Sequence, residues 1–262
     1  MIKTIYGNKT DLLQRESMGL VTQDMASVFK TKYVDAMLKA DDYTLTKEPS
    51  FCFISVDPNG GGSSNMAIVS MCVEYNKIIL VGLDTKPCKS HEEIEKFLTT
   101  HVEQLRKHPR LKECWFVCVL ENNLGHEADH LSFILKPYRK VYVLTEKNGV
   151  IGVCTTHTRK ELYAMETVKY FCQESIKIWK DLVISNVGSS REAVLQDFKE
   201  QLLQFKRIIV SPMRGFALPK IHYSGKANGG QDDFVMALIM CVYWVGEFLT
   251  QRTEAPYDMF GD

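Results

Sequence analysis

The order of strand-like and helix-like segments most limits the folds open to this chain of 262 residues. Three β-rich runs come first, and the tripeptide YNK fits a tight turn between the second and the third. An amphipathic helix, with Ser90 in position to cap it, then alternates with strands and a further helix. The runs lie at 51–57, 65–75 and 77–85, and the helix, strand, helix and strand after them at 90–108, 114–120, 125–136 and 140–145. Helical crossovers join parallel strands, so we expect an α/β fold in which an antiparallel three-strand meander is extended by parallel strands and flanked by helices.

The second half of the chain continues this alternation and ends in an apolar helix. We expect a helix at 160–174, a strand at 176–185, a helix at 190–204, a strand at 207–211 and a short β run at 220–224. The last segment, 229–249, is apolar on all sides for three turns, which predicts a helix buried in the core. Its longest apolar run, from Phe234 to Val245, has 12 residues. A bilayer span needs about 20, so we expect no contact with a membrane.

Residues 1–50 differ from the rest because they are polar and have only short apolar stretches. The stretch ESMGLVTQDMASVF in this part has no evident partner strand. We therefore expect residues 1–50 to be a linker or the end of another domain, and residues 51–262 to form the globular domain.

Composition limits the partners and the compartment. The 32 basic and 32 acidic residues give a formal net charge of zero, so only a local basic patch could attract nucleic acid or an anionic membrane. The eight cysteines lie mostly inside apolar runs and form no CxxC pair, which favours a reducing intracellular compartment over a disulfide framework.

Four acidic residues stand at the ends of these elements. Asp57 ends the first predicted strand, Glu121 follows the strand at 114–120, and Asp232 and Asp233 begin the last helix. Alone, each is more typical of a turn or a helix cap. Parallel neighbouring strands, however, would bring Asp57 and Glu121 to the same sheet edge. A cluster of carboxylates without His or Cys suits Mg²⁺ or Mn²⁺ and is what two-metal phosphoryl transfer requires.

Three motifs around these acids resemble those of a known family. SVDPNGGGSSNMAIVSM, VLENNLGHEADHL and YSGKANGGQDDFVMALIMCVYWVGE are similar to the motifs of the nuclease domain of the herpesvirus large terminase subunit. That domain is RNase H-like and related to tailed-phage large terminases. The resemblance runs from about residue 51 to 249 and implies that Asp57, Glu121 and the Asp232/Asp233 pair hold two Mg²⁺ or Mn²⁺ ions.

The resemblance also implies a biological role. Nucleases of this family cut concatemeric viral double-stranded DNA into genome lengths in the host cell nucleus. Their partners are the ATPase domain of the same polypeptide, other terminase subunits and the portal. This sequence contains no GxxxxGK[ST] motif, because GKANGG has alanine in place of the hydroxyl residue. We therefore expect a nuclease domain separated from its motor, with residues 1–50 as a linker or the end of the missing ATPase domain.

Basic residues near the third motif are the candidates for DNA contact. Lys220, His222 and Lys226 lie just before the two aspartates. Lys226 is the strongest of the three because it belongs to the motif itself, where its cation could meet a phosphate.

Two other functions stay open at this point. His126, Glu127 and His130 match HExxH, the helical zinc motif of metallopeptidases, although no third ligand is evident. A silent RNase H-like docking module would also fit the fold, but it would be expected to lack one of the acids, and none is missing.

Overall fold

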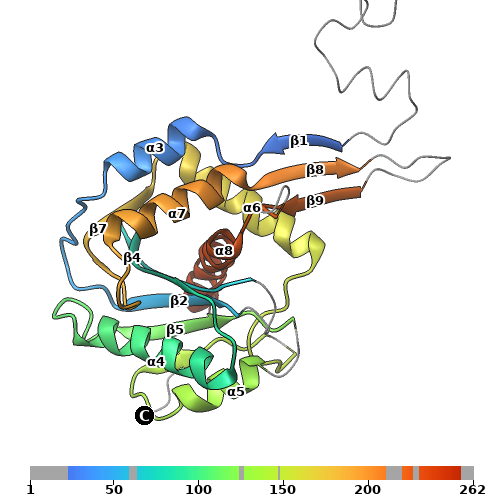
Figure 1. The fold of residues 1–262 in the computed structure, drawn as a ribbon. Helices are drawn as coiled ribbons and strands as arrows, with labels where there is room; N and C mark the ends of the chain where they lie inside the picture. Colours follow the sequence, from blue (N-terminus) through green and yellow to red (C-terminus); the bar gives the residue numbers. More distant parts are fainter. Residues whose placement is uncertain are drawn as a thin grey trace, which may run out of the picture.

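The computed structural model describes residues 23–58, 64–123, 127–146, 148–210, 220–226 and 230–254. A six-stranded mixed sheet lies at the centre, helices cover both of its faces, and a smaller three-stranded sheet lies to one side (Figure 1). The predicted α/β class with a mixed sheet is confirmed.

The central sheet has the strand order β6-β5-β2-β3-β4-β7. Its strands are β2 (Phe51–Asp57), β3 (Met66–Glu74), β4 (Lys77–Lys86), β5 (Trp115–Leu120), β6 (Val141–Val143) and β7 (Ile176–Val183). Strands β2, β3 and β4 form the predicted antiparallel meander, whereas β2, β5 and β6 are parallel. Tyr75 and Asn76 both have positive φ, as a two-residue hairpin turn requires.

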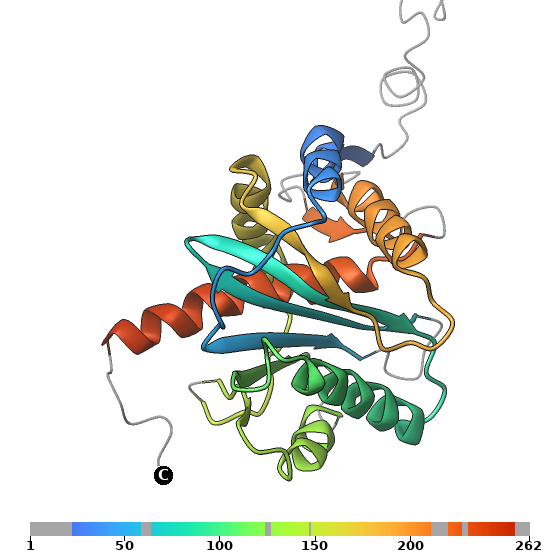
Figure 2. The ribbon, with the colours of Figure 1, turned by 90° about the vertical axis from the view of Figure 1, so that its left-hand side faces the viewer.

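Helices form two layers around this sheet (Figure 2). One layer consists of α4 (His91–Lys107) and α5 (Glu127–Leu135), and the other of α3 (Thr31–Lys39), α6 (His157–Cys172), α7 (Arg191–Gln204) and α8 (Asp233–Glu254). Because side chains alternate along a strand, β2 contributes Phe53 to one hydrophobic core and Ile54 to the other. Ser90 and Ser190 cap α4 and α7 through their side chains.

The last helix, α8, is the core helix that its sequence predicts. It packs against β2, β3 and α6, and its residues from Phe234 to Val242 are buried. Its segment Asp233–Thr250 is long and apolar enough to cross a membrane, but two thirds of it is buried inside this domain. Its apolar surface therefore serves the core of the fold.

A second sheet corrects one expectation about the first 50 residues. It joins β1 (Gln23–Ser27), β8 (Lys206–Val210) and β9 (Lys220–Ser224) in antiparallel pairs. The prediction that this part of the chain has no partner strand is thus wrong. The partner lies about 180 residues further along, and local sequence patterns carry no information about so distant a pairing. That residues 1–50 end another domain stays a prediction.

Candidate active site

Carboxylates from three separate elements line one pocket of about 540 Å³. Asp57 ends β2, Glu121 follows β5, and Asp232 precedes α8. Strands β2 and β5 are parallel and paired up to Val56 and Leu120, so their ends lie at one sheet edge. The structure therefore brings together the three acids at the place that open α/β sheets use for ligands.

The main chain at Glu121 is held from both sides. Its N–H donates to the Val56 carbonyl at 3.0 Å, and Val153 pairs with it in a parallel bridge. Gly152, which precedes this bridge, has φ +77°, and a Cβ there would lie 2.6 Å from the Leu120 carbonyl oxygen. Only glycine fits so close an approach.

The two neighbouring aspartates have different positions. Asp232 lines the pocket, and its Oδ2 accepts a hydrogen bond of 2.9 Å from the Gly225 N–H. Asp233 begins α8, and its Oδ2 accepts a hydrogen bond of 3.0 Å from the Asn65 N–H. Asp232 thus faces the pocket directly, whereas Asp233 ties α8 to the segment that leads into β3.

Two lysines accompany these acids. Lys226 Nζ lies 3.6 Å from Asp232 Oδ1 and 3.9 Å from Asp233 Oδ1, and it donates to Ser64 Oγ at 2.9 Å. Lys160 Nζ, on α6, lies 3.8 Å from Asp232 Oδ2. The sequence around Lys160 does not mark it as a site residue, because it belongs to the ordinary basic cluster HTRK.

The other predicted DNA contacts are placed only in part. His222 on β9 lines the pocket, with its ring centroid 5.2 Å from that of His157. The main chain of Lys220 belongs to β9, and its side chain lies outside the described residues.

The pocket is electrostatically crowded. Burial raises the pKa of Asp57 well above its usual range, and the Glu121 carboxylate, with which it shares a hydrogen bond, adds to the rise. Burial also raises the pKa of Asp233, although the hydrogen bond from the Asn65 N–H and the charge of Lys226 act to lower it. Burial lowers the pKa of Lys160, while Asp232, Asp57 and Glu121 oppose this effect. Carboxylates that raise one another's proton affinity also attract a cation.

The donor set fits a divalent metal in its chemistry. Carboxylate oxygens are the ligands that Mg²⁺ and Mn²⁺ prefer, and Asp57, Glu121 and Asp232 supply them in the lining of one pocket. In the described part of the chain, no group of three or more His, Cys, Asp or Glu side chains is arranged so that it could hold a metal ion as it stands. The positive charge beside Asp232 comes instead from Lys226 and Lys160.

The HExxH residues lie apart from this pocket. Glu127 is the first residue of α5, and His130 Nε2 forms a hydrogen bond with Glu95 of α4. His126 lies outside the described residues. The zinc alternative therefore stays a matter for experiment.

The pocket is also lined by residues that the sequence motifs do not indicate as site residues. Asn123, Thr155, Thr156, His157, Tyr223, Ser224 and Met236 complete its lining. Asn123 stands two residues after Glu121, where an asparagine is usually read as a turn residue.

Comparisons with known proteins support the fold. No family model matches the chain, and no curated protein matches it. The human cytomegalovirus terminase nuclease domain, soaked with Mn and bound to an inhibitor, superposes with a TM-score of 0.63 at 14% identity, covering 86% of this chain and 98% of that one. Another structure of that domain gives a TM-score of 0.61 at 16% identity, with coverage of 86% and 98%.

A bacterial virus provides a further similar structure. The nuclease domain of the large terminase subunit gp2 of Sf6 gives a TM-score of 0.51 at 9% identity, covering 83% of this chain and 98% of that one. The resemblance predicted from the three acidic motifs is thus confirmed at the level of the fold: this chain has the RNase H-like fold of the terminase nuclease domains.

Proposed function

We propose that this chain is a DNA endonuclease domain of the terminase type, which hydrolyses phosphodiester bonds of double-stranded DNA with two Mg²⁺ or Mn²⁺ ions. The observation that carries the proposal is the convergence of Asp57, Glu121 and Asp232 on one pocket that also contains Lys160 and Lys226. The similarity in fold to terminase nuclease domains, one of them soaked with Mn, supports it.

The residues have distinct proposed roles. Asp57, Glu121 and Asp232 would hold the ions, with Asp233 close by as a further carboxylate. When bound, the ions would activate the attacking water and stabilise the leaving oxygen. Lys160, Lys226 and His222 line the same pocket and would attract the phosphate backbone, with Lys220 beside them on β9. This local positive charge would provide an attraction that the net charge of zero does not.

The biological setting that we propose rests on the resemblance in sequence. The domain would cut concatemeric herpesvirus DNA into genome lengths during packaging, in the host cell nucleus. It would act together with an ATPase domain of the same polypeptide, other terminase subunits and the portal.

The direct test is cleavage of duplex DNA by the purified chain with Mn²⁺, Mg²⁺ or EDTA. We expect cleavage with either metal and none in EDTA. Glu121→Gln should reduce the rate by more than about 100-fold, because even the loss of groups that only support metal ligands costs 10- to 100-fold.

Glu127→Gln is the matched control, since Glu127 is also a glutamate of the second motif but lies on α5 outside the pocket lining. It should cut at the rate of the unchanged chain. Cleavage that persists in EDTA, or that requires ATP, would contradict the proposal. Stoichiometric zinc bound to the unchanged chain, together with a peptidase activity that Glu127→Gln abolishes, would support the metallopeptidase alternative. Binding of DNA without any cleavage would support the docking module.

A further inference from the structure

The side chain of Glu121 needs a partner that fixes its direction. Hydrogen bonds to β2 and the bridge to Val153 hold its main chain. They leave the side-chain torsions free, and a glutamate retains considerable rotamer entropy unless its carboxylate is bound. The hydrogen-bond partners described for this carboxylate are Asp57, which is itself an acid, and Asn123, and the charge of Lys160 acts on it electrostatically.

Asn123 has the geometry of such a partner. Its Nδ2 donates to Glu121 Oε1 at 2.7 Å. Its Oδ1 accepts from the Thr155 N–H at 2.8 Å and lies 3.5 Å from the Cys154 thiol. A main-chain N–H can only donate, so the amide oxygen must face Thr155 and the NH₂ group must face Glu121. The orientation of the amide is therefore set by the main chain.

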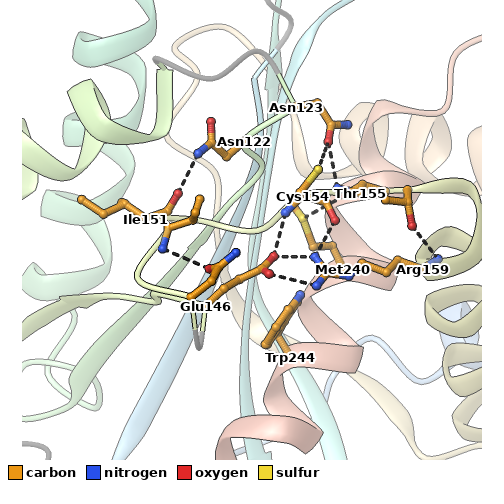
Figure 3. Close-up of polar contacts among 12 residues, drawn as sticks. Asn122, Asn123, Glu146, Ile151, Cys154, Thr155, Arg159, Met240 and Trp244 are labelled. Carbon is orange, nitrogen blue, oxygen red and sulfur yellow. Dashed lines mark hydrogen bonds and ion pairs between the residues drawn. The ribbon is translucent and has the colours of Figure 1, made fainter.

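The segment that orients Asn123 is itself held by an ion pair (Figure 3). Glu146 accepts a hydrogen bond of 3.0 Å from the Cys154 N–H. Arg159 donates through Nη2 to Glu146 Oε2 at 2.9 Å and through Nη1 to the Cys154 carbonyl at 2.8 Å. The ion pair and these hydrogen bonds join the loop before α6 to Glu146, which follows β6, and to the first turn of α6. This loop thus provides a fixed support for Asn123.

We propose that Asn123 is a positioning residue that fixes the direction of the Glu121 carboxylate in the pocket, and that the Cys154–Thr155 segment holds it for this task. Its amide is a neutral donor, so it orients the carboxylate without adding a charge that would compete with a cation. The consequence for catalysis rests on the proposed function, whereas the consequence for the conformation of Glu121 does not.

Asn122 offers a matched control for this proposal. It is the same residue type, one position earlier, and its Nδ2 donates to the Ile151 carbonyl at 2.8 Å, on the same loop (Figure 3). It does not belong to the pocket lining. Asn122→Ala therefore loosens the loop without removing the donor to Glu121, and Asn123→Ala removes that donor.

The experiment compares the unchanged chain, Asn123→Ala and Asn122→Ala by three measurements. In metal-free crystals, Glu121 should keep its side-chain conformation in Asn122→Ala and leave it or become disordered in Asn123→Ala. Mn²⁺ titrated into the protein without DNA should bind about 10- to 100-fold more weakly to Asn123→Ala. On duplex DNA, kcat should fall by a similar factor while KM stays within about twofold.

The outcomes separate this proposal from the proposed function. An unmoved Glu121 in crystals of Asn123→Ala would overturn the positioning role, whatever the activity. Equal losses of Mn²⁺ affinity in both variants, or a loss confined to KM, would overturn it as well, because they indicate loop loosening or direct contact with DNA. If the unchanged chain neither binds Mn²⁺ nor cuts DNA, the proposed function fails, and the crystals of the metal-free variants still decide the role of Asn123.

Discussion

Asp57 shows how a proposed metal ligand can cost stability. The side chain is half-buried at the end of β2, next to the carboxylates of Glu121, Asp233 and Asp232. Burial first, and these neighbours second, raise its pKa. A carboxyl group whose pKa is higher in the folded state than in the unfolded state disfavours folding at pH values above the unfolded pKa, where the unfolded chain ionises more readily. A bound cation would remove this cost.

We therefore predict that Asp57→Asn raises the melting temperature of the metal-free chain at pH 7, or at least does not lower it. Mn²⁺ at 100 times its dissociation constant should stabilise the unchanged chain by about 2.7 kcal/mol, and the variant should lose most of this gain. Thermal melts in EDTA and in Mn²⁺ measure both effects. Asp129→Asn is the control, because Asp129 is an exposed acid of α5. A lower melting temperature in EDTA together with a full Mn²⁺ shift would mean that Asp57 is only a turn residue.

The sequence pattern indicates the acidic residues of the pocket much better than it indicates the residues that surround them. Asp57 and Glu121 could be selected because each directly follows a buried strand, and parallel strands end at one edge. Lys160 acquires its position from the packing of α6 against α8, and Asn123 is oriented by its contact with Thr155 in the loop before α6. That packing depends on contacts between distant segments, which no local pattern records.

At the scale of elements, a buried polar network joins β3, β4 and α4. Ser70 Oγ lies 2.7 Å from His101 Nε2, and His101 Nδ1 lies 2.6 Å from Asp84 Oδ2. Asp84 also accepts hydrogen bonds from Ser185 and Asn186 in the segment after β7. The order Ser, His, Asp is that of a nucleophilic triad, but these three side chains are 0% exposed, so no substrate can reach them. The network stabilises the fold.

This network predicts a pH dependence of stability. Burial alone would raise the pKa of Asp84, but hydrogen bonds from His101 and Ser185 outweigh it and lower the pKa. The stabilisation is therefore complete above the unfolded pKa of about 3.9 and is lost as the pH falls below it, through the lower folded value. We expect Asp84→Asn to be less stable at pH 7 by about 1–3 kcal/mol, since buried donors lose their acceptor.

Denaturant unfolding of both chains between pH 7 and pH 3 measures this effect. The difference in free energy of unfolding between the unchanged chain and Asp84→Asn should shrink as the pH drops below about 4. Asp181→Asn serves as a control, because Asp181 is an exposed acid of the neighbouring strand β7. A difference that stays constant down to pH 3 would show that Asp84 contributes through packing rather than charge.

Most elements were predictable because their periodicity is strong and their caps are explicit. The meander, the parallel strands β5 and β6, and the helices capped by Ser90 and Ser190 lie within a few residues of their expected bounds. The position of β7 was not predictable. It pairs in parallel with β4 at the far edge of the sheet, and its local sequence does not indicate which edge it joins.

At the scale of the whole molecule, the chain before residue 51 contributes to the same fold as the chain after it. Strand β1 lies beside β8 (Figure 1), and the residue that follows it, Val28, donates to the Phe205 carbonyl at 3.0 Å. Phe29, Val34 and Met37 belong to the core between the sheet and α8, and Leu45 belongs to the core on the opposite face. Both cores therefore include residues of the segment 1–50, for which the sequence predicts a linker or the end of another domain.

This arrangement predicts that a chain beginning at Phe51 does not fold cooperatively. Phe29, Val34, Met37 and Leu45 are each at most 4% exposed, and burying one such side chain contributes about 1.5–3 kcal/mol. The burial of all four side chains together thus contributes a free energy comparable with the 5–15 kcal/mol that stabilises a typical domain.

In the full chain, Phe29→Ala should lower the free energy of unfolding by about 3–5 kcal/mol, because its ring contacts those of Phe171 and Phe205. Lys32→Ala, an exposed change in the same segment, should cost less than about 0.5 kcal/mol. Urea unfolding followed by circular dichroism measures all three. If the chain beginning at Phe51 unfolds at the same urea concentration as the full chain, these four side chains contribute nothing to the domain, and the boundary at residue 50 is the correct one.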